Sequence, residues 1–390
     1  MLKALFFGAA SVSSCNTVYP ILDELSSQYQ LIAYNCEGFS PPLHHRYTFK
    51  TYPPYEGGYH PTCMDENTSY LQFGEILIDT AASLSGYVVS EIEREKPDFI
   101  LYSHLAVWGR LAANHFDIPA ISMFNTFVMD KRVMLSYFRK KPKNVGGTDH
   151  LKDTIRFSRK LARLHDELKV RTEPDIWDIY INPGGPNLSC IFENFQPDRQ
   201  VLGPECKFIG FPGEINGEYP NRDIIYVAMG TILNRNEEFY KLCIRALGQL
   251  DQHCVLVVGR STNIASLGDV PGNIQIVPFA DQVNTLKRSM VFLTRGGMAS
   301  VHEALYAKTP MIVIPEMAEQ QMNAETIESM GVGLHLPAPD VSEESILQSI
   351  NHILKNHSTY TSNIRALIAA APQRSPGEIA AESIISYIGN

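Results

Sequence analysis

The residues best suited to chemistry lie in one stretch, residues 291–305, around a pair of adjacent glycines. A short apolar run that suits a strand leads into Gly296 and Gly297, and apolar residues at helical spacing follow them. A helix that begins at such a turn presents unsatisfied backbone N–H groups and the positive end of its dipole. Both favour an anion such as a diphosphate, and the glycines let it approach the backbone closely. The stretch therefore predicts an anion site at the start of a helix.

Three side chains in the same stretch support this prediction. Arg295 carries a permanent positive charge on a planar fork of donors that suits phosphate oxygens. Ser300 supplies a hydroxyl, and Glu303 lies one helical turn later, where its carboxylate could accept hydrogen bonds from a sugar or ribose hydroxyl. The alternative is an ordinary strand–helix turn of a parallel sheet, with Arg295 solvated and Glu303 exposed.

Composition limits the classes of protein to consider. A length of 390 residues favours two domains, and a hydrophobic fraction of 44% is ample for globular cores, which argues against disorder. The net charge is −9 and the chain has no long Lys/Arg run, so we expect no nucleic-acid partner. No apolar run approaches the roughly 20 residues of a membrane-spanning helix, so we expect no membrane span.

Cysteine usage and the N-terminus indicate the compartment. The seven cysteines are scattered and form no Cys-x-x-Cys pair, which favours reduced thiols in the cytoplasm over a disulfide framework or a metal site. The N-terminal apolar run is too short for a signal peptide and suits a first strand instead. We therefore predict a cytoplasmic protein without a bound metal.

Strands alternate with helices in both halves of the chain, which predicts an α/β fold of parallel sheets with helices on both faces. We expect a loop over residues 9–16, a helix over 17–28 and one long helix over 358–390. The Pro-, Gly- and Tyr-rich segment 36–68 predicts a functional loop, such as an acceptor-facing wall. Residues 211–222 are the best linker candidate because of their Pro and Gly content. Gly-x-Gly-x-x-Gly is absent, so a dehydrogenase-type dinucleotide site is unsupported.

Four motifs in the second half stand in order at the spacing of a known family. They are Tyr226-Val-Ala-Met-Gly-Thr231, Val258-Gly-Arg260, Arg295-Gly-Gly-x-x-Ser300-x-x-Glu303 and Pro315-Glu-Met-Ala-Glu-Gln320-x-x-Asn-Ala324. As a set they resemble the nucleotide-sugar site of GT-B glycosyltransferases, specifically the macrolide-type UDP-glycosyltransferases. The first half is similar to the family mainly in layout and length.

The resemblance implies two Rossmann-like domains facing across a cleft. It implies an acceptor domain over residues 1–210, a linker over 211–222, a nucleotide-sugar domain over 223–365 and a C-terminal helix over 366–390 that crosses back to the first domain. The implied reaction is inverting and needs neither metal nor other cofactor. It moves a sugar from a UDP- or TDP-sugar to a small acceptor such as a polyketide or a phenol. The chain would act as a monomer or a homodimer.

The resemblance also assigns roles to residues by position. Gly230, Thr231, Arg295, Gly296, Gly297 and Ser300 would lie at the diphosphate, Arg260 and Gln282 at the base, Glu303 at the ribose, and Glu319 and Gln320 at the sugar hydroxyls. Arg295 stands where the family usually has His, and a cation there still suits a diphosphate. Glu319 stands where the family has Asp, which leaves the identity of the sugar open. Asn16 and Trp108 are candidate acceptor contacts, and packing is the alternative for Trp108.

The catalytic pair of the family is missing. Ser14 stands where the family carries the His that deprotonates the acceptor, and Ser103, followed by His104, stands where it carries the Asp that orients that His. A serine hydroxyl is no useful base near neutral pH, and loss of a general base typically costs ~10²–10⁴ in rate.

Three interpretations of this loss remain open. The acceptor is a phenol, thiol or amine that needs little help. Alternatively, another side chain serves as base, with His104, His60, Asp65 and Glu66 as candidates. Or the chain is a catalytically silent homologue that binds a sugar nucleotide as a sensor or auxiliary subunit. An epimerase or lyase on the same fold is a weaker alternative, because the second-half motifs supply few acid/base groups beyond Glu319.

Overall fold

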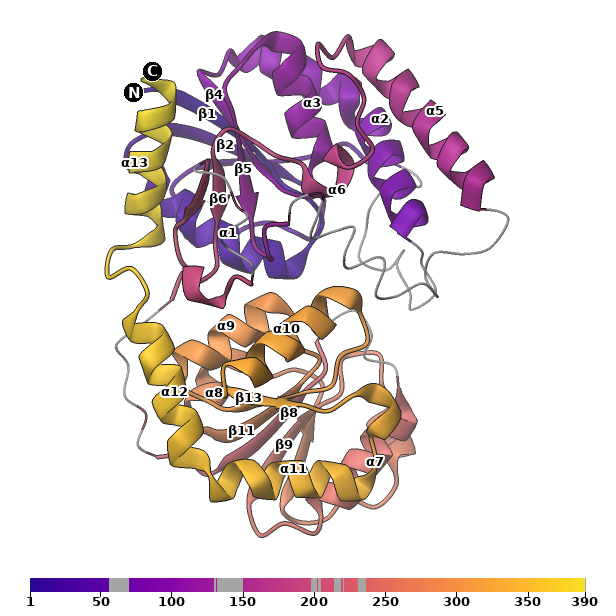
Figure 1. Cartoon of the computed structure of the whole chain (residues 1–390), viewed down its shortest axis with the longest axis vertical. Coiled ribbons are helices and arrows are strands. Elements are labelled where there is room, and N and C mark those ends of the chain that lie inside the picture. Colours follow the sequence, from indigo (N-terminus) through magenta and orange to yellow (C-terminus); the bar gives the residue numbers. More distant parts are fainter. Residues whose placement is uncertain are drawn as a thin grey trace. The chain divides into compact units, whose positions relative to one another are not determined.

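The computed structural model describes residues 1–55, 70–129, 131, 150–197, 202, 205–213, 219, 221–230 and 236–389. The chain forms two compact units. The first unit comprises Met1–Pro212 together with Pro372–Asn390, and the second comprises Gly213–Ala371. Each unit is a parallel α/β structure, as the alternation of strands and helices predicts (Figure 1). Among the described residues, no helix has both the length and the apolar character that crossing a bilayer requires.

The described part of the first unit contains a seven-stranded sheet in the order β3-β2-β1-β4-β5-β6-β7, with every pairing parallel. Its strands are β1 (Lys3–Phe7), β2 (Gln30–Asn35), β3 (Thr48–Thr51), β4 (Phe99–Ser103), β5 (Ala120–Phe124), β6 (Asn187–Ser189) and β7 (Cys206–Phe208). Its helices are α1 (Val12–Leu25), α2 (Tyr70–Glu95), α3 (Val107–Phe116), α5 (His150–Leu168), α6 (Asp178–Ile181), the short 3₁₀ helix η3 (Glu193–Phe195) and α13 (Pro376–Ile388).

Side chains of this sheet alternate between two cores because successive residues of a strand point to opposite faces. Leu5 and Phe7 of β1 pack with buried residues of α2, α3 and α5. Ala4 and Phe6 pack on the other face with buried residues of α1 and α13. Helices therefore cover both faces (Figure 1). The predicted α/β class with parallel sheets is confirmed, and the last helix belongs to the first unit, as expected.

Helix α1 begins earlier than the sequence pattern suggests. The loop expected over residues 9–16 ends at Ser11, because α1 starts at Val12. Ser11 caps the helix, and its side chain accepts a hydrogen bond from the backbone N–H of Ser14. A capping serine satisfies one of the free N–H groups of a helix start, which allows the helix to begin among small residues. Ser14 consequently lies in the first turn of the helix that follows the carboxyl end of β1.

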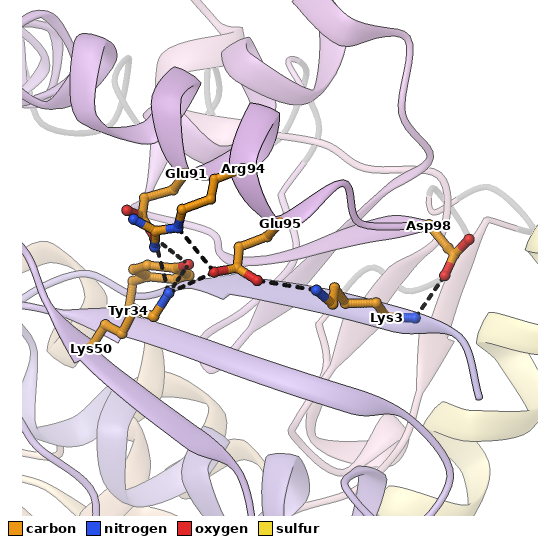
Figure 2. Close-up of polar contacts among 7 residues, drawn as sticks. All are labelled: Lys3, Tyr34, Lys50, Glu91, Arg94, Glu95 and Asp98. Carbon is orange, nitrogen blue, oxygen red and sulfur yellow. Dashed lines mark hydrogen bonds and ion pairs between the residues drawn. The ribbon is translucent and has the colours of Figure 1, made fainter.

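A network of charged side chains fixes the end of α2 to the sheet (Figure 2). Lys50 of β3 bonds both Glu91 (3.2 Å) and Glu95 (2.8 Å), and the Tyr34 hydroxyl donates to Glu91 (2.8 Å). Lys3 of β1 reaches Glu95 from the other side, at 3.1 Å. These contacts hold the pKa of Glu95 down to about 2, chiefly through the hydrogen bond from Lys50. The network therefore joins α2 to three neighbouring strands.

The described part of the second unit contains a six-stranded parallel sheet in the order β10-β9-β8-β11-β12-β13. Its strands are β8 (Ile224–Ala228), β9 (His253–Val257), β10 (Ile274–Val277), β11 (Ser289–Thr294), β12 (Met311–Val313) and β13 (Gly333–His335). Its helices are α7 (Glu237–Leu247), η5 (Ile264–Leu267), α8 (Gln282–Lys287), α9 (Met298–Tyr306), α10 (Ala318–Ser329), η6 (Ala338–Asp340), α11 (Glu343–Lys355) and α12 (His357–Ala369).

The chain ends in two helices where one was expected over residues 358–390. Helix α12 stops at Ala369, and α13 starts at Pro376 behind a capping box formed by Ser375 and Glu378. Proline at the first helical position fits a helix start, since its missing N–H would be unpaired there in any case. Helix α13 packs on α1, where the backbone N–H of Gly377 donates to Glu24 at 3.1 Å.

Candidate functional site

The glycine pair forms the predicted turn between β11 and α9. Gly296 has a φ of +79°, and a Cβ there would lie 2.4 Å from Cγ1 of Val313, so only glycine fits. Gly297 occupies the N-cap position of α9 in extended conformation, and a Cβ on it would meet open space. The turn thus leaves open space beside Gly297 at the N-terminus of the nine-residue helix α9, so an anion could approach the backbone N–H groups there.

Three residues predicted to contact the nucleotide come together at this helix. The side-chain amide nitrogen of Gln282 donates to the Ser300 hydroxyl at 3.0 Å and to the Glu303 carboxylate at 2.6 Å. All three side chains are half-buried. Burial raises the pKa of Glu303, and the Gln282 hydrogen bond partly offsets this effect. The group combines hydroxyl, amide and carboxylate in one place, a set of donors and acceptors suited to a ribose or a base.

Arg295 does not present a free positive charge, contrary to expectation. Its residue exposure is 5%, and its guanidinium forms an ion pair with Glu316. The guanidinium carbon lies 5.2 Å from the ring centroid of Phe239, and Nη1 donates to the carbonyl of Ile314 at 3.5 Å. Burial lowers the pKa of Arg295, while Glu316 raises it. The side chain therefore points into the unit and is already neutralised.

The residues predicted to bind the sugar lie at the start of α10. Gln320 uses its side-chain oxygen to cap this helix, accepting from the backbone N–H groups of Glu316 (2.9 Å) and Met317 (3.0 Å). Its amide nitrogen is the group left to meet a ligand. Glu319 is exposed. The fully buried Asn323 donates to the carbonyl of Gly296 at 2.7 Å, which ties α10 to the glycine turn.

The other predicted nucleotide contacts lie on loops of the same unit. Gly230 lies two residues after the end of β8 and has a φ of +77°, and Thr231 lies outside the described residues. Arg260 is exposed, and its guanidinium lies 5.9 Å from the ring centroid of Phe279, itself 69% exposed. Sequence reasoning missed Phe279, although an aromatic residue close before Gln282 was a visible signal. Glu316 and Asn323 stand in the fourth motif but received no role, because their partners, Arg295 and Gly296, are distant in sequence.

The two positions of the missing catalytic pair do lie together in the first unit. The Ser14 hydroxyl, on α1, is 3.2 Å from the Ser103 hydroxyl, at the end of β4. Both residues are buried, with exposures of 4% and 0%. Two neutral hydroxyls in contact can share a hydrogen bond but cannot take up a proton at neutral pH.

His104 is a poor candidate for a relocated base. It is buried, its ring stacks on Phe124 with centroids 5.4 Å apart, and burial lowers its pKa to about 4. Its Nδ1 has no hydrogen-bond partner among the described residues. At neutral pH the imidazole is uncharged and a weak base. The other candidates, His60, Asp65 and Glu66, lie outside the described residues.

The position of Trp108 favours packing, the alternative to a contact with an acceptor. Trp108 is 1% exposed within the core under α2 and α3, and its indole N–H donates to the Tyr52 hydroxyl at 3.0 Å. Asn16, by contrast, is exposed on α1, two residues beyond Ser14. Within the described part of the chain, no three His, Cys, Asp or Glu residues cluster as metal ligands would, and the six cysteines found there are unpaired thiols.

Comparisons with known proteins agree with this architecture. Residues 241–385 match the family described as Erythromycin biosynthesis protein CIII-like, C-terminal domain. The chain is 25% identical over 354 residues to an uncharacterized UDP-glucosyltransferase of Bacillus subtilis, YojK, covering 87% of this chain and 85% of that protein. It is 22% identical over 313 residues to the oleandomycin glycosyltransferase of Streptomyces antibioticus, covering 75% and 70% respectively.

Solved structures show the same fold. The glycotransferase of kitacinnamycin superposes with a TM-score of 0.82 at 19% identity, covering 99% of this chain and 100% of that one. The glycosyltransferase VinC, solved in complex with dTDP, superposes with a TM-score of 0.73 at 15% identity over the full length of both chains. At such low sequence identity, these superpositions establish only that the chain has the two-domain GT-B fold.

Proposed function

We propose that this chain transfers a sugar from a UDP- or TDP-sugar to a small natural-product acceptor, because it is similar in sequence to bacterial UDP-glucosyltransferases and a macrolide glycosyltransferase and shares the fold of such enzymes. The observation that carries the proposal is the cluster of Gln282, Ser300 and Glu303 beside the Gly296 turn. This cluster offers ribose and base contacts next to a helix N-terminus that suits a diphosphate. The nucleotide sugar is a co-substrate, and the reaction uses no further cofactor.

In the proposed reaction, the oxygen of a phenol or the sulfur of a thiol acceptor attacks the anomeric carbon of the sugar. The bond from that carbon to the diphosphate breaks, the nucleoside diphosphate leaves, and the acceptor proton passes to solvent. A single displacement of this kind inverts the anomeric centre. Backbone N–H groups at the start of α9 stabilise the charge that develops on the leaving diphosphate, so we propose transfer without a metal ion.

The Ser14–Ser103 contact limits the choice of acceptor. An alcohol ionises far above neutral pH and depends on a base, whereas a phenol or thiol supplies a useful fraction of anion without one. We therefore propose a phenol-type or thiol acceptor for a chain that we place in the cytoplasm, as a monomer or a homodimer.

The test is activity of the purified protein. It would be incubated with UDP-glucose, UDP-galactose and TDP-glucose and with matched phenol, thiol and alcohol acceptors, and products would be read by mass spectrometry. We expect glycosylated phenol or thiol well in excess of glycosylated alcohol. An alcohol glycosylated as fast as its matched phenol would remove the argument about the missing base.

A second candidate is a catalytically silent homologue that binds a sugar nucleotide as sensor or auxiliary subunit. The same hydroxyl pair favours it, because nothing at those two positions can act as a base. Tight binding of a sugar nucleotide with no product from any acceptor would support this candidate. Product formation would exclude it.

A further inference from the structure

Two side-chain links join the glycine turn to helix α10 within the second unit. In the first, the buried amide of Asn323 donates to the carbonyl of Gly296 at 2.7 Å. In the second, Arg295, the residue before the glycines, forms its ion pair with Glu316, two residues before α10. The turn predicted to meet the diphosphate and the helix start predicted to meet the sugar are thus fixed to each other twice.

The second link continues into the sugar-facing side chain. The backbone N–H of Glu316 donates to the side-chain oxygen of Gln320 at 2.9 Å. A shift of Glu316 toward or away from Arg295 therefore moves the cap of α10, and with it the orientation of the Gln320 amide. The ion pair acts on the predicted sugar contact through one residue.

The surroundings of Arg295 explain why its charge is directed inward. Its guanidinium lies over the ring of Phe239 and near the carbonyl of Ile314, with a side-chain exposure of 6%. A buried permanent cation needs an opposite charge, because its desolvation would otherwise be very unfavourable. Glu316 supplies this charge through Nη2, so the charge of Arg295 is balanced without a diphosphate, while its buried Nε has no hydrogen-bond partner among the described residues.

We propose that Arg295 and Glu316 are positioning residues for the sugar, and that neither contacts the diphosphate. Their ion pair sets the start of α10, including Gln320, relative to the Gly296 turn. The pair thereby determines how much the sugar adds to nucleotide binding and how well the sugar is aligned for transfer. The inference rests on the proposed donor function of this unit.

The test separates the sugar from the nucleotide. The sugar nucleotide used is the one that the wild type binds most tightly among UDP-glucose, UDP-galactose and TDP-glucose. Titration calorimetry would give its Kd and the Kd of the matching free nucleotide, which is UDP, or TDP if TDP-glucose is chosen. The variant is Glu316→Gln, and the matched control is Asp223→Asn, which alters an exposed ion pair with Arg288 (2.6 Å) in the same unit.

For Glu316→Gln we expect the Kd of the free nucleotide to stay within about threefold of wild type, the size of a neutral surface change. The ratio of the Kd of the free nucleotide to the Kd of the sugar nucleotide should fall by about 10- to 100-fold, in line with the cost of misplacing a positioned group. The control should change neither value.

Other results would overturn the inference. Equal weakening of free nucleotide and sugar nucleotide would identify a general structural role, and a selective loss of free-nucleotide binding in Arg295→Met would identify a direct diphosphate contact. No change in either value would show that the pair has no role. If Glu316→Gln fails to fold, the double variant Arg295→Met, Glu316→Met leaves no unpaired charge and should show the same selective loss. A wild-type protein that binds no nucleotide would refute the proposed function itself, which is a distinct outcome.

Discussion

Restoring the absent catalytic pair, by Ser14→His together with Ser103→Asp, should accelerate transfer to alcohols. The two hydroxyl oxygens are 3.2 Å apart, so side chains at these positions already meet at hydrogen-bond distance. An imidazole held by a carboxylate titrates near neutral pH and can remove the proton of an acceptor. A general base contributes ~10²–10⁴ in rate.

We expect the lower end of that range, about 10²-fold or roughly 2.7 kcal/mol of barrier, because the larger side chains enter a packed region. Ser14 and Ser103 are 4% and 0% exposed, and overpacking of this kind typically lowers stability by about 1–3 kcal/mol. The rate with a phenol should rise much less than the rate with an alcohol, because the phenol ionises with less help.

The assay compares initial rates for one alcohol and one phenol of similar shape across pH 5–9. The matched control, Ser14→Gln with Ser103→Asn, adds comparable volume without a base. A gain for the alcohol in the His/Asp variant alone, with a rising limb near pH 7, supports the reasoning. An equal gain in the control, or none in a folded variant that still binds the sugar nucleotide, refutes it.

Three further outcomes test the structure. Glu95→Gln should lower the free energy of unfolding above about pH 4.5 and change it little near pH 2. The reason is that the pKa of Glu95 is lowered in the fold, so its contact with Lys50 stabilises the fold above the ordinary pKa. This stabilisation is lost as the pH falls toward about 2. Urea unfolding at several pH values measures this, with about 3 kcal/mol as the upper bound, which solvent screening reduces. Trp108→Phe should lower the free energy of unfolding by about 1–3 kcal/mol, because the hydrogen bond to Tyr52 is lost. It should leave the KM for the acceptor unchanged. A large rise in that KM would identify Trp108 as an acceptor contact. Gly296→Ala should weaken nucleotide binding and lower the Tm, because the φ is +79° and a Cβ would lie 2.4 Å from Cγ1 of Val313. The control Gly297→Ala should change the Tm little, since a Cβ there meets open space.

The sheet architecture could be predicted because it depends on local patterns. Strand Ile224–Ala228, for example, is a run of apolar and β-branched residues, the pattern typical of a strand that is buried on both faces of a parallel sheet. The start of α1 was misplaced because its first turn, from Val12, consists of small and polar residues with little apolar periodicity. The break before α13 was visible in Ser375, Pro376 and Glu378, a proline-led capping box that the apolar pattern alone does not show.

The site was predictable in its members but not in their contacts. The proximity of Ser14 and Ser103 follows from the topology, because β1 and β4 are neighbours and their carboxyl ends meet at one edge. The inward direction of Arg295 does not follow from its sequence neighbourhood, which predicts a phosphate ligand equally well. That direction depends on Glu316, whose pairing with Arg295 only the folded sheet brings about.

The central claim is that the Gly296 turn and the Gln282–Ser300–Glu303 cluster hold a nucleotide diphosphate sugar. Titration calorimetry with UDP, TDP and their glucose conjugates tests it most directly, using Gln282→Ala as the site variant and Asp223→Asn as the control. We predict that wild type and control bind with measurable heat and a Kd below about 1 mM, the usual upper range for substrates. For Gln282→Ala we predict a Kd at least about tenfold higher, because a hydrogen-bonding side chain is lost. No heat from any of these ligands with the folded wild-type protein, or equal affinity for wild type and Gln282→Ala, would contradict it.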